Sequence, residues 1–154
     1  MYTKRPALAL AGFVDADFAN DNDNLKSISV HILLIAMNSI SLHSQKQNCV
    51  STSTIKAIYI SISLTGKWLL WLQYAMKELA FISIPSPLST DEEEVVDWTE
   101  NSRIRHCNKH IDIAIHQIYD LVKSDKLVVL YIPSLSNPAN ICTKKLPELI
   151  FFIL

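Results

Sequence analysis

The chain has 154 residues, of which 49% are hydrophobic, and its formal net charge is −1. That length allows one domain with a real core, and the apolar content excludes an intrinsically disordered chain. The near-neutral charge excludes a strong overall basic field, so any contact with nucleic acid must come from a local patch.

The cysteines and the apolar runs indicate the class of protein. Cys49, Cys107 and Cys142 are widely spaced and odd in number, which predicts neither a disulfide framework nor a zinc site of paired cysteines. No signal peptide is recognisable, and apolar runs such as residues 32–37 fall far short of the roughly 18 residues that cross a bilayer. We expect a soluble, intracellular, cytoplasmic or nuclear protein with one domain over residues 1–154. With only two glycines, its tight turns should rely on Asn, Asp and Ser.

The first third of the chain predicts three strands. Residues 7–14 form an apolar run that ends at Asp15, residues 29–35 are rich in β-branched side chains and leucine, and residues 39–43 alternate. The short links between them predict an antiparallel meander. A strand that ends on a carboxylate can hold a divalent cation, because hard cations prefer oxygen ligands fixed in space. The simpler alternative is a polar turn, since residues 20–24 are rich in Asn and Asp.

A helical pattern follows this meander. Residues 53–81 carry apolar side chains at helical spacing after N-cap candidates at residues 51–54, and we expect two helices that meet near Gly66. Trp68 and Trp71 fall on this spacing, which favours a place in the core over a cofactor site.

The second half of the chain alternates between strands and helices. Residues 88–90 predict a short strand that ends at Asp91, and the acidic residues 92–94 suit the first turn of a helix, where the macrodipole favours negative charge. The remaining pattern predicts a polar, basic loop at residues 101–108, a helix at 109–123, a buried strand at 126–132, a loop at 133–138 and a short helix from 139 to 144. The order β-β-β-α-β-α-β-α indicates the α/β fold class, with a sheet that opens as a meander.

The five histidines predict no chelating or catalytic pair. His110 and His116 lie six residues apart in one predicted helix and therefore do not share a face. His31, His43 and His106 stand isolated in the sequence.

An ordered series of short motifs runs along the chain. It reads GFVDADFAND at residues 12–21, ISLHSQKQ at 40–47, KELAF at 77–81, NKHIDI at 108–113, YIP at 131–133 and ANICTKKLP at 139–147. In this order and spacing, the series resembles the ribonuclease H domain of the Pol polyprotein of copia-type LTR retrotransposons over about residues 8–147. Each motif alone is weak, whereas the ordered series is specific. The apolar tail at residues 148–154 departs from the family.

The resemblance implies a ribonuclease H-like fold, in which helices pack on a five-stranded mixed sheet. It also implies hydrolysis of the RNA strand of an RNA–DNA hybrid during reverse transcription, beside a reverse transcriptase domain and without a membrane. The family's chemistry uses four carboxylates that hold two Mg²⁺ ions about 4 Å apart. One ion activates the attacking water, and the other stabilises the leaving 3′ oxygen.

By the resemblance, the four carboxylate positions fall on Asp15, Ile58, Asp91 and Asn140. Asp15 and Asp91 are retained as the catalytic and metal-binding pair, whereas the other two positions carry an apolar side chain and an uncharged amide. Too little negative charge then remains to hold two dications close together. We therefore expect a degenerate copy with weakened Mg²⁺ binding and impaired nuclease activity.

Two alternatives stay open. Asp17 or Glu92, close in sequence to the retained carboxylates, are the candidates to substitute as metal ligands. The other alternative is a non-catalytic nucleic-acid-binding or protein-interaction module on the same fold, whose candidate surface is Arg103, Arg105, Lys109, Lys144 and Lys145. Ordinary solvation is the simpler account of these cations. Further departures favour a degenerate copy, because family glycines are replaced by Val30, Ala36 and Met37.

Overall fold

The computed structural model describes residues 9–19, 21, 23–79, 85–101 and 109–143. The elements follow in the order β1 (Leu10–Asp17), β2 (Ile28–Ile35), β3 (Asn38–Lys46), α1 (Thr54–Glu78), β4 (Ser86–Thr90), α2 (Glu93–Asn101), α3 (Lys109–Lys123), β5 (Leu127–Tyr131) and the 3-10 helices η1 (Ser134–Ser136) and η2 (Pro138–Cys142). No helix within these ranges is long and apolar enough to cross a membrane.

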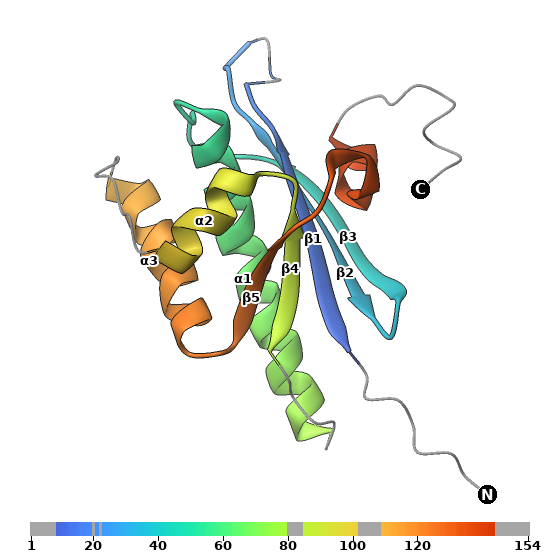
Figure 1. The fold of residues 1–154 in the computed structure, drawn as a ribbon. Helices are drawn as coiled ribbons and strands as arrows, with labels where there is room; N and C mark the ends of the chain where they lie inside the picture. Colours follow the sequence, from blue (N-terminus) through green and yellow to red (C-terminus); the bar gives the residue numbers. More distant parts are fainter. Residues whose placement is uncertain (1–8, 20, 22, 80–84, 102–108, 144–154) are drawn as a thin grey trace, which may run out of the picture.

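The strands form one five-stranded mixed sheet in the order β3-β2-β1-β4-β5 (Figure 1). The pairs β1–β2 and β2–β3 are antiparallel, and β4 and β5 join on the other side of β1 as parallel strands. The predicted fold class and the opening meander are therefore confirmed. Because β1, β4 and β5 run in the same direction, their carboxyl ends meet at one edge of the sheet.

Helix α1 covers one face of the sheet, and η2 lies against the other (Figure 1). Val14 and Ala16 of β1 pack in one hydrophobic core with Ile58 and Ile62 of α1. Asp15, whose side chain alternates with these two along the strand, is instead bonded to Thr143 just after η2. One face of β1 therefore packs in the hydrophobic core, and the opposite face contacts a polar cluster.

The helical stretch after β3 is one helix and not the expected two. Ser53 caps α1, since its hydroxyl accepts a hydrogen bond from the Lys56 N–H at 3.3 Å. Gly66 continues the helix and lies against α3, where a Cβ atom would approach Leu121 Cδ1 to 3.3 Å. The glycine therefore permits close helix packing rather than ending a helix.

Trp68 and Trp71 lie on the outer side of α1, so their predicted core position is wrong. Their side chains are 51% and 61% exposed, whereas the intervening Leu69 is fully buried. The apolar residues of this helix extend around more than one face, and spacing alone did not identify which of them meets the sheet. The two indole rings contact each other edge to face, with centroids 6.3 Å apart.

Two further differences concern the last third of the chain. Strand β5 lies at the edge of the sheet, so Leu127 and Val129 are buried but Val128 and Leu130 are exposed, and the expectation of a fully buried strand is wrong. The expected final helix is the short 3-10 helix η2, where the Asn140 N–H donates to the carbonyl three residues earlier.

Most left-handed backbone positions in the described ranges do not carry the residue types that the sequence suggested for turns. Among the described non-glycine residues with left-handed φ, only Asp125 belongs to the expected polar class, and the others are Ala19, Leu25, Ala36 and Met37. Ala36 and Met37 alone link β2 to β3, with φ of 50° and 66°. Such a two-residue hairpin turn normally carries Asn, Asp or Gly.

Candidate active site

Asp15 lies inside β1 and not at its end. The strand extends to Asp17 because β2 continues to pair with it, Asp15 opposite Val30 and Asp17 opposite Ile28. The Asp15 carboxylate is only 6% exposed. Its Oδ1 accepts the Ala16 N–H at 2.8 Å, and its Oδ2 accepts the Thr143 hydroxyl at 2.7 Å.

Asp91 comes directly after β4 and lies near Asp15 at the carboxyl edge of the sheet. The parallel register pairs Phe13 with Ser89, and its continuation by two residues places Asp91 beside Asp15. The structure therefore brings the carboxylates of Asp15 and Asp91 to the same edge of the sheet.

Asn140 turns its amide nitrogen toward Asp91. This Nδ2 donates to the Ser134 carbonyl at 2.6 Å and to the Ser134 hydroxyl at 2.8 Å, and it lies 3.5 Å from Asp91 Oδ2. The side chain is 4% exposed, and its Oδ1 has no hydrogen-bond partner within the described part of the chain. A buried acceptor without a partner costs free energy, so this amide is imperfectly satisfied.

Asn137 is a site residue that the sequence interpretation missed. Its buried amide donates to the Val14 carbonyl at 3.0 Å and lies 3.5 Å from Asp91 Oδ1. Its Oδ1 accepts the Ala139 N–H at 3.1 Å and so caps η2. An Asn directly before a Pro is a recognisable capping signal, but the bond to β1 joins residues far apart in the sequence.

Ile58 is fully buried in the second turn of α1. It belongs to the same hydrophobic cluster as Val14 and Ala16, the neighbours of Asp15 in β1. Its hydrocarbon side chain offers no ligand atom to a cation.

Glu92 adds a third carboxyl group to this edge. Burial raises the pKa of Glu92, and the negative charges of Asp91 and Asp15 raise it further. Asp17, which is half-buried, shares the Asp15 side of β1 by strand alternation. The candidates for ligand substitution are thus close to the retained pair, at an edge that already carries a high density of negative charge.

The side chains at this edge do not fit a centre of two divalent ions. No group of three or more His, Cys, Asp or Glu side chains within the described residues is arranged to hold a metal ion. Asp15 uses both carboxylate oxygens in hydrogen bonds, and the nearest atom of Asn140 to Asp91 is a nitrogen donor. A cation would have to displace these bonds and turn the Asn140 amide.

The described part of the Asp-rich segment after β1 forms the polar turn that was the simpler alternative for it. Asp21 forms an ion pair with Lys46 of β3 and accepts a hydrogen bond from Asn24. Lys46 and Asn24 hold the pKa of Asp21 below its usual value. The segment therefore closes the β1–β2 connection against β3, as expected of a polar turn.

Several sequence-predicted residues lie outside the described ranges. They are Arg103, Arg105, His106, Cys107, Lys144, Lys145 and the apolar tail 148–154. Lys109 is the first residue of α3.

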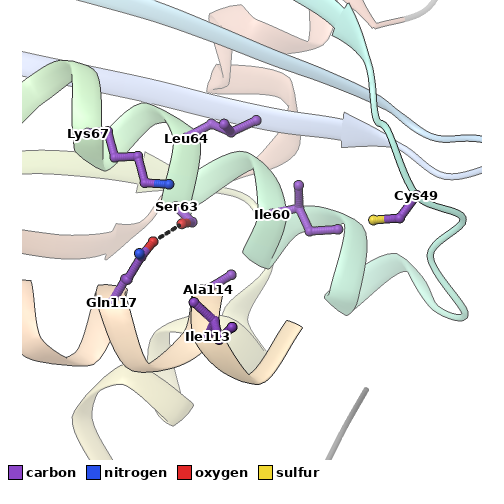
Figure 2. A pocket seen from close by; sticks show the side chains of 8 residues that line it. All are labelled: Cys49, Ile60, Ser63, Leu64, Lys67, Ile113, Ala114 and Gln117. Carbon is purple, nitrogen blue, oxygen red and sulfur yellow. Dashed lines mark hydrogen bonds between the residues drawn. The ribbon is translucent and has the colours of Figure 1, made fainter. Parts of the chain in front are cut away.

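A pocket of about 210 Å³ lies elsewhere, between α1 and α3 (Figure 2). Ile60 and Leu64 of α1 and Ile113 of α3 give it an apolar lining. Ser63 donates a hydrogen bond to Gln117 Oε1 at 3.1 Å across it. None of the carboxylates at the sheet edge lines this pocket.

Sequence comparison finds relatives among transposon polyproteins. The chain is 36% identical over 139 residues to the retrovirus-related Pol polyprotein from transposon TNT 1-94 of Nicotiana tabacum, covering 90% of this chain. It is 30% identical over 149 residues to the polyprotein from transposon RE2 of Arabidopsis thaliana, covering 96% of this chain. The chain spans about 10% of the length of these curated relatives. No protein-family model matches it.

Structural comparison identifies the fold. LC11 ribonuclease H1, isolated from compost, matches with a TM-score of 0.62 at 15% identity, over 86% of this chain and 90% of that one. A foamy viral protease-reverse transcriptase, solved in complex with an RNA/DNA hybrid, matches with a TM-score of 0.58 at 15% identity, over 100% of this chain and 22% of that one. These likenesses show that the chain has the ribonuclease H fold.

Proposed function

We infer that this chain, a ribonuclease H-type domain homologous to a segment of retrovirus-related Pol polyproteins, derives from a copia-type element and has lost most of its nuclease activity. Its ancestral substrate is the RNA strand of an RNA–DNA hybrid, and its ancestral partner is the reverse transcriptase part of the same polyprotein. The complex of the foamy viral enzyme with an RNA/DNA hybrid supports this substrate class for the fold.

One observation carries the proposed loss of activity. At the position assigned to the fourth carboxylate, Asn140 presents an N–H donor toward Asp91 and keeps its own oxygen buried. The amide thereby supplies hydrogen bonds where the ancestral site would supply negative charge. Ile58, at another assigned position, is part of the hydrophobic core.

The remaining groups still define a polar edge with a fixed shape. Thr143 orients the Asp15 carboxylate, and Asn137 joins Asp91 to the backbone of β1. Asp15 and Asp91 would be the residues to hold Mg²⁺, which in an intact site would supply activation of the attacking water and stabilisation of the leaving oxygen. Here we propose at most a weak, single-ion contact at Asp15 and Asp91.

A hybrid-cleavage assay with gain-of-function variants tests the proposal. The purified protein is incubated with a labelled RNA–DNA hybrid in Mg²⁺ or Mn²⁺, and circular dichroism confirms that each variant is folded. The wild type should show no cleavage above background. The double variant Ile58→Glu/Asn140→Asp should gain activity, on the order of 10²-fold or more, because it restores the carboxylates that hold the ions.

The matched control adds Asp15→Asn to the double variant and should remove the gained activity. Robust cleavage by the wild type that Asp15→Asn abolishes would overturn the proposed loss of function. A filter-binding titration across salt concentrations separates loss of catalysis from loss of hybrid binding, since phosphate contacts weaken steeply with salt. Salt-dependent binding without cleavage would instead support a non-catalytic binding module.

A further inference from the structure

A second polar cluster lies on the α1 side of the sheet, away from the carboxylates. His31 of β2 and His43 of β3 are directly opposite each other in the antiparallel register. Their ring centroids are 5.3 Å apart, and the ring planes are inclined by 31°. The expectation that the two histidines are isolated is therefore wrong, because the hairpin brings together residues that the sequence separates.

His31 has a largely buried imidazole ring whose nitrogens form no hydrogen bond within the described part of the chain. The side chain is 5% exposed, its ring nitrogens are not fully enclosed, and no hydrogen bond joins them to the part of the chain that the structure describes. Trp68 of α1 covers it, with ring centroids 6.5 Å apart. A ring nitrogen that forms no hydrogen bond can bind an ion without first losing a partner.

His43 has a lone pair available. Its Nε2 lies 2.9 Å from Gln45 Oε1. An amide oxygen only accepts, so Nε2 donates in this bond, and in the neutral ring Nδ1 then carries the lone pair. Metal-binding histidines are typically held in this way, with one ring N–H donated to a carbonyl and the other nitrogen free for the metal.

We propose that His31 and His43 together form a binding site for a divalent transition-metal ion of the Zn²⁺ class. A Zn–N bond of about 2.0–2.1 Å and a tetrahedral angle between two imidazoles place their ring centroids about 5 Å apart. The observed separation of 5.3 Å matches this geometry. Imidazole nitrogen suits Zn²⁺, Ni²⁺ and Cu²⁺, whereas Mg²⁺ prefers oxygen, and water completes the coordination.

The protonation state of His31 suits this role. Burial, and secondarily the charge of His43, lower the pKa of His31 to about 4. The imidazole is therefore neutral at physiological pH, and metal binding does not have to displace a proton from it. The buried ring of His31 can therefore act as a ligand without losing a proton. An ion enters the site from the side on which the exposed His43 lies.

Isothermal titration with ZnCl₂ tests the site, with excess MgCl₂ present to occupy hard-cation sites. We expect one Zn²⁺ per chain, and His43→Gln should weaken the affinity at least about tenfold because it removes one of the two ligands. His116→Gln, which replaces an exposed histidine of α3, is the matched control and should bind like the wild type. His31→Gln should act like His43→Gln, with circular dichroism to confirm its fold.

Imidazole NMR signals locate the ion independently of affinity. Zn²⁺ should shift the ring signals of His31 and His43 and leave that of His116 unchanged. The proposal is overturned if no stoichiometric binding occurs, or if His43→Gln binds Zn²⁺ as tightly as the wild type. It is also overturned if Asp91→Asn removes the binding and His43→Gln does not, which would assign the ion to the carboxyl edge.

Discussion

Under the proposed assignment, Asn140 stands where the family carries a carboxylate, so it would change the charge of the carboxyl edge and keep its hydrogen bonds. Its amide nitrogen bonds to Ser134 and lies 3.5 Å from Asp91, so a group that would repel Asp91 as a carboxylate now faces it as a donor. In a site built to bind cations, like charges are held close, and this costs stability in the absence of metal. The substitution should therefore make folding independent of divalent ions.

Asn140→Asp reverses this effect and gives the first prediction. In EDTA the variant should lose about 2–3 kcal/mol of unfolding free energy, because it loses the buried bonds to Ser134 and places a carboxylate beside Asp91. Millimolar Mg²⁺ should restore part of this loss, because an ion that binds only the folded state stabilises it. Urea denaturation with and without Mg²⁺ measures both changes.

Asn140→Ala is the matched control, since it loses the same bonds without adding charge. Its stability should not respond to Mg²⁺. If Asn140→Asp is equally insensitive to Mg²⁺, the carboxyl edge has lost even the capacity for one ion.

His31 gives the second prediction, which concerns acid stability. Its pKa is about 4 in the folded chain against an ordinary value of 6.5. Between these pH values the unfolded chain binds a proton that the folded chain does not, so the unfolding free energy should fall as the pH drops from about 6.5 and level off below about 4. With allowance for solvent screening, the loss should be about 2 kcal/mol.

Denaturation curves from pH 7 to pH 4 in EDTA measure this dependence. The decline attributable to His31 should be absent in His31→Gln and intact in His116→Gln. His43, which faces His31 from β3, is the neighbouring charge to vary in a second series. A His31→Gln curve parallel to the wild type would contradict the prediction.

At the scale of single elements, the β2–β3 hairpin carries local strain. Ala36 and Met37 both adopt left-handed φ, a conformation that costs L-residues with a Cβ roughly 1–2 kcal/mol each. Met37 is also strongly exposed and so gains no compensating burial there. The hairpin is held by pairing along the strands and not by its turn.

Met37→Gly should therefore stabilise the domain, by about 1 kcal/mol, despite the entropy that glycine adds to the unfolded chain. Thermal and urea unfolding measure the gain. Ser44→Gly, at an exposed strand position without left-handed φ, is the control and should destabilise. Equal effects of the two glycines would show that the turn is not strained.

Most elements were predictable because their signals are local. The apolar period of residues 109–123 gave the bounds of α3 correctly, and the β-branched run at residues 29–35 gave β2 to within one residue. The expected helix break at Gly66 was wrong, because the low helix propensity of glycine is outweighed here by close packing against Leu121. Whether an apolar strand is central or at an edge, as for β5, depends on the whole sheet.

At the scale of the whole molecule, a buried polar network joins the meander to α1. Gln47 donates to Ser29 Oγ at 2.8 Å and to the Ala57 carbonyl at 2.9 Å, and it accepts from Ser51 at 2.9 Å. Ser61 of α1 donates to the same Ser29 hydroxyl at 2.6 Å. One amide thus links β2, the loop after β3 and the first turns of α1.

Gln47→Ala should lower the unfolding free energy by about 2–3 kcal/mol, because it leaves several buried polar groups without their partner. The matched control is Gln45→Ala, two residues earlier and exposed, whose effect should stay within about 0.5 kcal/mol. Urea denaturation compares the two variants. Similar small effects would mean that water replaces the amide without cost.

The site was predictable only where the chain topology brings residues together. The ordered motifs were enough to place Asp15 and Asp91 at one edge of the sheet, which the register supports. The positions of Asn137 and Thr143 depend on side-chain bonds to β1 across more than 120 residues, and no local pattern encodes these. The His31–His43 pair likewise follows from the strand register and not from sequence spacing.

Strand β3 has a consequence for how copies of this domain behave together. It is the last strand on its side of the sheet, and both Ile40 and Leu42 are exposed on it. An unpaired strand edge with apolar side chains is a template on which another chain can add its own strand. Lys46 is the only permanently charged side chain of β3, and Asp21 already neutralises it. We therefore expect copies of this domain to associate through this edge in concentrated solution.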